Sequence, residues 1–258
     1  MKKISAIIGV CLMGLGLSTA AFCADATLNL DVNSAYVSRG YTYSDGMVLQ
    51  PSLDVAKGGF DVNIWGNMNM TNYHNSLDTN EFSEVDLYVG YTRVFDKLAV
   101  TGGIYQYIYP PMDSAKTLGL TPNGANTEEL YLNGALDLGS GLALGLSVYY
   151  DVDTYKDWCY SNLNLGYTYS VNKKLAIIPS IAAGYISKPE SDGKSGFKDY
   201  RATLKATYAL TDTIGLGANI NYTDAIDSDV LNSHNDNNFG SPGHDVHTYG
   251  GVTVNCKF

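Results

Sequence analysis

Apolar and polar residues alternate along the chain from Thr27 to Phe258. Phe60, Val62 and Ile64, for example, fall on one face of an extended segment, and the residues between them are polar. Because successive side chains of a β-strand point to opposite faces, a period of two predicts strands with one apolar and one polar face. The predicted strands cover residues 27–36, 48–56, 60–70, 84–94, 98–109, 127–138, 142–151, 160–171, 175–185, 198–210, 214–222 and 245–258.

The connections between these strands alternate in length. Short turns such as Gly58-Gly59 follow every second strand, and longer polar loops fill 37–47, 71–83, 110–126, 152–159, 186–197 and 223–243. An even number of strands of about ten residues, with short turns at one rim and long loops at the other, is typical of outer-membrane barrels. We therefore predict an all-β fold, a transmembrane antiparallel up-and-down β-barrel of about 12 strands. A soluble β-sandwich or barrel is the alternative, because alternation alone does not separate inside from outside.

The positions of aromatic residues favour the membrane. Aromatic residues on the apolar faces gather near both ends of the strands, as two girdles at the two membrane interfaces would. Near the short turns lie Phe60, Tyr91, Tyr167, Tyr169, Tyr208 and Phe258, and near the long loops lie Tyr36, Tyr150, Tyr185, Tyr200 and Tyr222.

The N-terminus has the layout of a secretory signal peptide. Two lysines precede an apolar run over residues 4–17, and small residues follow it. The run is too short to span a bilayer as a helix. We expect residues 1–26 to be a signal peptide cleaved within 23–26. A lipid anchor on Cys23 is the weaker alternative, because the bulky Phe22 stands where a small residue is expected.

Composition agrees with an exported barrel. The mean hydropathy of −0.09 would suit a soluble protein. In a barrel, however, apolar lipid-facing residues and polar lumen-facing residues make opposite contributions to this mean, and the two cancel. The chain has 21 Tyr, 27 Gly and only 16% charged residues. Its net charge of −10 argues against nucleic acid as a partner. Cys159 and Cys256 would lie near opposite ends of their strands, so we expect no disulfide framework.

The C-terminal strand predicts how the barrel is assembled. Val252, Val254, Cys256 and Phe258 share its apolar face, and the chain ends on the aromatic residue. Such an ending is typical of outer-membrane barrels, whose last strand closes the sheet against the first. We expect 27–258 to form a single barrel domain in the bacterial outer membrane, with both termini in the periplasm and lipid around it.

Three stretches carry a family resemblance. The segment SAYVSRGYTYSDGMVLQPSLDV (residues 34–55), the following FDVNIWGN (60–67) and the terminal Phe258 resemble the TorF-family porins of bacterial outer membranes. The resemblance implies a porin-like role with no defined solute. The last strand also resembles the signal that the barrel-assembly machinery reads, although Cys256 stands where an ordinary apolar residue is usual.

The lumen is the predicted functional surface. Near the long loops the polar faces carry Arg39, Glu84, Asp86, Glu129, Asp151, Asp199, Arg201 and His247, and near the short turns they carry Asp31, Asp54, Asp61, Asp137, Lys205 and Lys257. Trp65 has an inward phase at mid-height, where it either narrows the pore, stacks on a sugar ring or simply fills space. Carboxylates outnumber bases, and Asp or Glu rings favour cations. We predict a narrow channel for small cations or neutral solutes. The residues predicted to line it and set its selectivity are Arg39, Glu84, Asp86, Glu129, Asp151, Asp199, Arg201 and Trp65. A plain solvated lumen with offsetting ion pairs is the alternative.

Other functions have weaker support. A barrel hydrolase needs a nucleophile beside a base, and no Ser or Cys has a phase that pairs with a histidine. His244, Asp245 and His247 are close enough in sequence for a dyad or a metal site, but we expect no catalytic residue, no metal and no cofactor. The acidic loop from Asp224 to Asp236 lacks the Gly and Glu of a calcium loop. A structural or adhesive barrel with a plugged lumen stays an alternative.

Overall fold

A computed structural model of the protein describes residues 24–71, 79–110, 126–232 and 244–258. Its strands are β1 (Asp25–Asn33), β2 (Tyr36–Ser38), β3 (Tyr41–Ser44), β4 (Val48–Lys57), β5 (Phe60–Asn69), β6 (Phe82–Phe95), β7 (Leu98–Ile108), β8 (Thr127–Gly139), β9 (Leu142–Asp151), β10 (Cys159–Tyr167), β11 (Tyr169–Ser170), β12 (Leu175–Ser187), β13 (Gly196–Ala209), β14 (Ile214–Ala225) and β15 (Thr248–Lys257). A 3-10 helix, η2 (Glu190–Asp192), and a short α-helix, α3 (Ser228–Asn232), lie in the connections.

Twelve strands form one closed antiparallel barrel. Going round the wall, the order is β1, β4, β5, β6, β7, β8, β9, β10, β12, β13, β14 and β15, and β15 pairs again with β1. The two-residue β11 follows β10 and pairs with β12. The prediction of a 12-strand up-and-down barrel is confirmed, and each predicted strand has a counterpart within a few residues of its predicted bounds.

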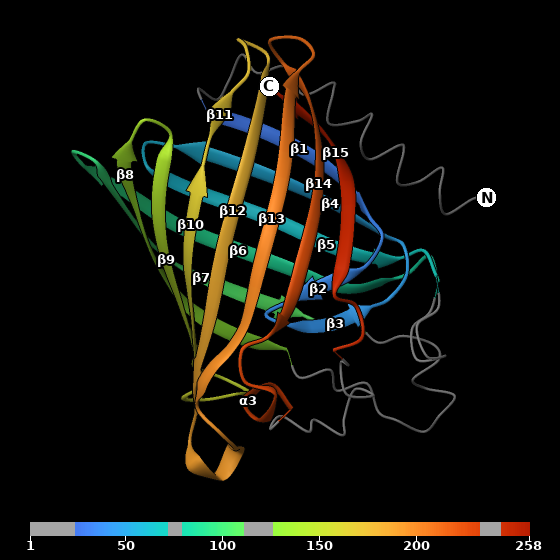
Figure 1. Ribbon diagram of the computed structural model, residues 1–258, viewed down its shortest axis with the longest axis vertical. Coiled ribbons are helices and arrows are strands. Elements are labelled where there is room, and N and C mark those ends of the chain that lie inside the picture. The colour runs from blue at the N-terminus through green and yellow to red at the C-terminus, as the bar shows by residue number, and fades with distance from the viewer. Residues whose placement is uncertain (1–23, 72–78, 111–125, 233–243) are drawn as a thin grey trace.

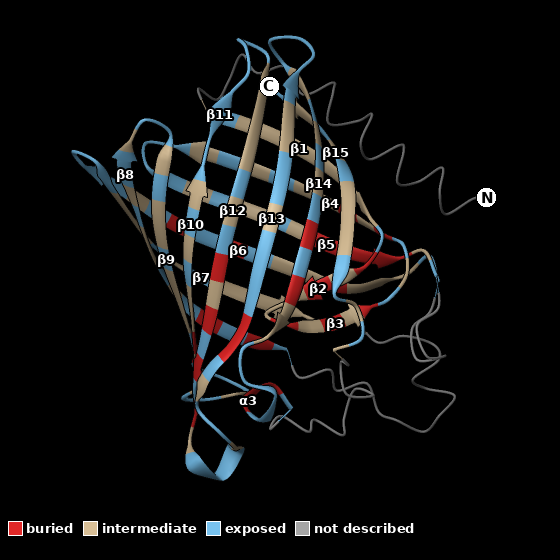
Figure 2. Cartoon of the chain, in the orientation of Figure 1, coloured by how far each residue is buried: buried red, intermediate tan, exposed pale blue. Residues whose placement is uncertain are grey.

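The apolar face of the strands is the outer face. Val89, Leu132 and Ile181 expose 55%, 55% and 61% of their surface, although each lies in the middle of its strand. In a protein with a packed interior such positions would be the core, so the exposed band is suited to lipid rather than water. Figure 2 shows that buried positions gather toward one end of the barrel, around β2, β3 and α3.

The two rims differ as the loop lengths predict. In Figure 1 the short turns and the C-terminus lie toward the top, and the connection between β12 and β13 lies with α3 toward the bottom. The predicted aromatic residues Phe60, Tyr91, Tyr167, Tyr169, Tyr208, Tyr150, Tyr185, Tyr200 and Tyr222 are all at least 37% exposed. Two of the predicted girdle residues differ: Phe258 is only partly exposed, and Tyr36 lies on β2 inside the barrel.

Some predictions fall outside the described residues. The signal peptide over 1–26 lies there except for its last three residues, of which Asp25 and Ala26 already pair in β1 with Ala56 and Val55 of β4. Parts of three long loops (72–78, 111–125 and 233–243) lie there too. Cys159 and Cys256 are free thiols. Neither η2 nor α3, nor any other described segment, is a helix of the length and hydropathy needed to cross a membrane.

The first long connection departs most from prediction. The strand predicted over 27–36 ends at Asn33, and the predicted loop 37–47 contains the hairpin β2–β3. Its two-residue turn, Arg39-Gly40, has φ angles of 49° and 80°, as tight hairpin turns with two left-handed residues require. The alternation of residues 36–44 is therefore that of a separate small sheet, not of the barrel wall.

A β-bulge changes the inward face of β13. Gly184 of β12 pairs with Asp199, and Tyr185 pairs with Phe197, so that Lys198 is the extra residue. A bulge places two successive residues opposite one. Consequently Lys198 and Asp199 are both buried, at 2% and 5% exposure.

Candidate functional site: a constriction across the lumen

The β2–β3 hairpin crosses the barrel from one wall to the other. Its two ends join β1 and β4, and its tip reaches β8, β9 and β10, which lie about halfway round the ring of strands. The hairpin side chains of Thr42 and Ser44 are fully buried. The hairpin therefore divides the lumen near the rim with the long connections, where Figure 1 places β2 and β3.

Arg39 fixes the tip of the hairpin to the far wall. Its two terminal nitrogens donate to the two carboxylate oxygens of Glu129, at 2.7 Å and 2.6 Å. The Tyr107 hydroxyl donates to the same carboxylate at 2.8 Å. The guanidinium also lies over the rings of Tyr149 and Tyr160, 4.5 Å and 4.9 Å from their centroids. A bidentate pair with two cation–π contacts is among the stronger polar arrangements a side chain can make.

Gly40, the second turn residue, lies against β13 and α3. A Cβ atom added there would stand 2.8 Å from Cβ of Asp199 and 3.1 Å from Cδ1 of Leu231. The neighbouring Tyr41 donates its hydroxyl hydrogen to the Leu231 carbonyl at 2.9 Å. Lys198 lies over the Tyr41 ring, with Nζ 3.6 Å from the centroid. The hairpin is thus held at its tip and along its outer edge.

A band of tyrosines lines the inner wall next to the hairpin. Neighbouring rings of Tyr88, Tyr105, Tyr131, Tyr149 and Tyr160 lie 4.6, 5.5, 4.9 and 6.3 Å apart between successive centroids. These residues come from β6, β7, β8, β9 and β10 in order around the wall. The band gives one side of the lumen a continuous aromatic surface that ends at Arg39.

A cavity of about 390 Å³ lies at the constriction. Its lining includes seven of the residues predicted to line the pore: Arg39, Glu84, Asp86, Glu129, Asp151, Asp199 and Arg201. Trp65, the eighth, is absent from the lining. Its ring packs against that of Tyr36 at the base of the hairpin, with 5.6 Å between centroids.

The carboxylates of this cavity have different partners. Glu129 binds Arg39, whereas Asp151 accepts hydrogen bonds from Thr127 and from the backbone N–H groups of Asp153 and Tyr155. Asp151 therefore shapes its own loop. Oδ1 of Asp86 is buried without a hydrogen-bond partner among the described residues.

Sequence reasoning missed Lys198 and the role of the tyrosine band. Strict alternation from Asp199 and Arg201 assigns Lys198 to the lipid face, and the bulge reverses this assignment. The signal for the bulge is weak, although a lysine on a lipid face is itself costly and could have indicated an irregularity. The tyrosines had the correct inward phase, but nothing in their spacing revealed that a hairpin meets them.

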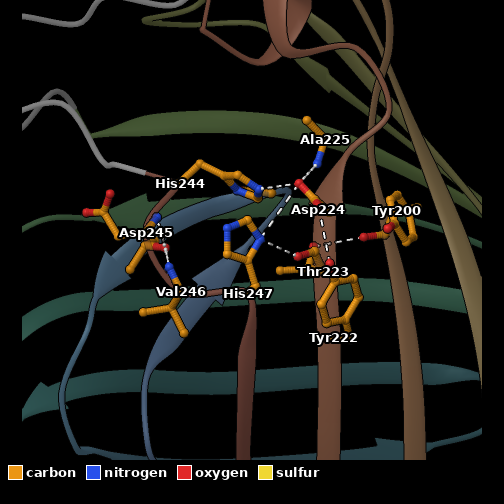
Figure 3. Close-up of polar contacts among 11 residues, drawn as sticks. Tyr200, Tyr222, Thr223, Asp224, Ala225, His244, Asp245, Val246 and His247 are labelled. Carbon is orange, nitrogen blue, oxygen red and sulfur yellow. Dashed lines mark hydrogen bonds and ion pairs between the residues drawn. The ribbon is translucent and has the colours of Figure 1, made fainter.

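A second polar cluster lies near the hairpin, at the end of β14 (Figure 3). Asp224, at the end of β14, has its Oδ1 atom 3.1 Å from Nε2 of His244 and 3.7 Å from Nδ1 of His247. The two imidazole rings meet edge to face, with centroids 4.7 Å apart. These three residues are close enough to share a metal ion. Asp245, named with the two histidines in the sequence, instead donates its backbone N–H to Thr42.

Comparisons with known proteins agree on the fold. Residues 18–136, just under half of the chain, match a family described as "Bacterial protein of unknown function (Gcw_chp)". No curated protein matches the chain. Neither this family nor the structures below carries the TorF name, so that resemblance stays a prediction.

Several solved structures are similar across almost the whole chain. The KdgM porin is 11% identical, with a TM-score of 0.54, covering 90% of this chain and 99% of its own. A KdgM porin in complex with disordered oligogalacturonate is 10% identical, with a TM-score of 0.53 and coverages of 91% and 99%. The COG4313 outer membrane channel from Pseudomonas putida F1 is 10% identical, with a TM-score of 0.52 and coverages of 91% and 95%. At these identities the likeness establishes a porin-type barrel fold.

Proposed function

We propose that the protein is a porin-like channel of the bacterial outer membrane, through which small solutes diffuse past the β2–β3 hairpin. The observation that carries this proposal is a closed barrel with an apolar exterior and a polar, hairpin-narrowed lumen. Lipid surrounds such a barrel, and only its interior is available to solutes. The similar structures include porins and an outer membrane channel, which supports passive transport over catalysis.

The orientation follows from the rims. The first residues of β1 and the last residue of the chain meet at the short-turn rim, where the backbone N–H of Phe258 donates to the Ala26 carbonyl at 2.9 Å. Outer-membrane barrels have short turns on the periplasmic side. We therefore place both termini in the periplasm and the hairpin, α3 and the histidine cluster toward the cell exterior.

Small cations and neutral solutes are the proposed cargo. Five carboxylates (Glu84, Asp86, Glu129, Asp151 and Asp199) and three bases (Arg39, Lys198 and Arg201) line the cavity. The excess of acidic side chains disfavours the passage of anions. Their effect is stronger in a narrow lumen, because water and salt screen charges less there than at an open surface. Oligogalacturonate, the anionic saccharide named with one KdgM structure, is for this reason not our proposed solute.

The reversal potential of single channels in a salt gradient tests this selectivity. We expect cation preference in the unchanged protein and a shift toward anions in a variant carrying Glu84→Gln, Asp86→Asn, Glu129→Gln and Asp199→Asn. Glu128→Gln is the matched control, because Glu128 is exposed and lies outside the cavity lining. An anion-selective channel whose reversal potential ignores the four substitutions would contradict the proposal.

The attachment of the hairpin favours a second candidate, a barrel whose lumen is closed and whose role is structural or adhesive. Arg39 ties the two walls together through both carboxylate oxygens of Glu129. A closed structural barrel should not conduct while Arg39 is in place. A porin-like channel should conduct before Arg39 is replaced by Gln, and more after it.

A further inference from the structure

We propose that Asp224, His244 and His247 form a binding site for one divalent transition-metal ion of the Zn²⁺ type at the outer mouth of the barrel. Two imidazoles and a carboxylate are a donor set that suits Zn²⁺, Cu²⁺ or Ni²⁺ better than Ca²⁺ or Mg²⁺. With three protein ligands, a fourth position would be left for water. The site is independent of whether the channel conducts.

The hydrogen bonds of His244 orient it as a ligand. Its Nδ1 atom lies 2.7 Å from the carbonyl oxygen of Gly40. A carbonyl only accepts, so Nδ1 carries a proton, and Nε2 is the nitrogen that faces Asp224 at 3.1 Å. In the neutral ring, Nε2 offers a lone pair to a carboxylate that also has only lone pairs. A proton or a metal ion between them resolves this conflict, and a backbone carbonyl behind the ring is the usual support of a metal-binding histidine.

Distances within the cluster are close to those of a coordination shell. Metal–ligand bonds of about 2.0–2.2 Å in a tetrahedral arrangement place neighbouring ligand atoms about 3.3–3.6 Å apart. The two histidine–carboxylate separations are 3.1 Å and 3.7 Å, and all three candidate atoms lie within 4.8 Å of one another. A small rotation of His247, whose side chain is 45% exposed, brings the third ligand in.

The surroundings hold Asp224 and His247 in place. The Tyr222 hydroxyl donates to Oδ2 of Asp224 at 3.2 Å, which leaves Oδ1 toward the histidines. The Tyr222 ring also stacks near that of His247, with centroids 6.2 Å apart. Nδ1 of His247 lies 3.2 Å from the Thr223 carbonyl, so binding through Nδ1 would displace the proton in that contact, as metal binding to histidine commonly does.

A bound ion would join parts of the chain that are far apart in sequence. It would tie the segment before β15 to the hairpin, because Nδ1 of His244 lies 2.7 Å from the carbonyl oxygen of Gly40 in the hairpin turn.

Zn²⁺ titration of the untagged, full-length mature chain, folded in detergent, tests the site against a chromophoric chelator. We expect one ion per chain, with an affinity lowered about tenfold or more in each of Asp224→Asn, His244→Ala and His247→Ala. Millimolar Ca²⁺ should not displace Zn²⁺. Because His244→Ala also removes the contact with Gly40, Asp224→Asn and His247→Ala decide the result if that variant folds poorly.

Asp212→Asn, at an exposed position in the short turn between β13 and β14, is the control and should leave Zn²⁺ affinity unchanged. Co²⁺ provides a second readout, since its visible absorption should appear with the unchanged chain and disappear with Asp224→Asn. Zn²⁺ affinity that is equal in the three variants and the unchanged chain, or that falls equally with Asp212→Asn, would overturn the proposal.

Discussion

Arg39 and Glu129 lie 90 positions apart in the sequence and form an ion pair at the constriction, at 2.6 Å. The Glu129 side chain is only 8% exposed, so it depends on this partner more than a surface carboxylate would. Arg39 also fills the space between the Tyr149 and Tyr160 rings and the hairpin turn. Its replacement therefore affects both packing and charge.

For Arg39→Gln we expect the free energy of unfolding in detergent to fall by about 1–3 kcal/mol, because a buried carboxylate loses its charged partner. The double variant Arg39→Gln, Glu129→Gln should recover part of this loss, since no unpaired charge remains. Urea titration followed by tryptophan fluorescence measures both. Arg93→Gln, at an exposed position on the outer face, is the control, and an equal loss there would contradict the assigned role of Arg39.

At the scale of the element, the hairpin depends on Gly40. Its φ of +80° lies in the left-handed region, and a Cβ atom would collide with Asp199. Gly58, in a wall turn, has a φ of +59°, but a Cβ atom added there would meet no described atom within 4 Å. Both glycines therefore have a left-handed backbone conformation, but only Gly40 lies too close to a neighbouring residue to leave room for a side chain.

We expect Gly40→Ala to be the more harmful substitution. Both alanines carry the backbone cost of about 1–2 kcal/mol, but only the one at position 40 pushes the hairpin tip away from β13. Channel conductance should therefore change in Gly40→Ala and stay the same in Gly58→Ala. Equal losses of stability together with equal conductance would show that the hairpin tip does not need this contact.

The last strand, β15, gives a prediction about assembly. Phe258 continues the outward phase of Val252 and Val254, which are 58% and 49% exposed, and its N–H completes the seam with Ala26. We expect removal of Phe258 to slow insertion by the barrel-assembly machinery, measured by the appearance of the folded form in membranes. Phe60→Ala, which removes an aromatic residue from the same rim, should insert normally. Normal insertion of the truncated chain would contradict this role.

The wall strands were predictable from sequence because each one carries its own signal. In β5, Phe60, Val62 and Ile64 indicate the outward face, and Gly58-Gly59 marks where the strand begins. The hairpin β2–β3 carries the same period of two, but its partner Glu129 is remote in sequence, so local pattern cannot tell a wall strand from an inserted one. Lys198 was missed for a related reason: one extra residue in β13 reverses the phase, and a strict period of two does not allow for a bulge.

The metal-ligand candidates show the same limit. His244 and His247 could be paired from their spacing alone, and the sequence placed Asp245 between them as the natural carboxylate. The structure instead supplies Asp224 from the neighbouring strand, through a backbone pairing in which Thr223 donates its N–H to the His247 carbonyl. Proximity across a sheet, not along the chain, decides which carboxylate joins the histidines.

At the scale of the whole molecule, the closed wall has no free strand edge, so every wall strand is hydrogen-bonded on both sides. We expect the mature chain to fold only in detergent or lipid and to migrate differently on gels before and after boiling. The comparison of unboiled and boiled samples checks this directly, with a chain kept in urea as the unfolded reference. A water-soluble monomer without detergent would contradict the assignment of the exposed aliphatic band to lipid.

A ring of twelve strands determines the perimeter of the barrel but not the shape of its cross-section, which can flatten without breaking a hydrogen bond. The hairpin acts as a strut across that cross-section, anchored at the β1–β4 wall and fastened to β8 through Arg39 and Glu129. The hairpin therefore fixes the distance between these two walls as well as narrowing the lumen. Because Arg39 and Glu129 join the hairpin to β8, loss of this one contact should make the cross-section easier to deform.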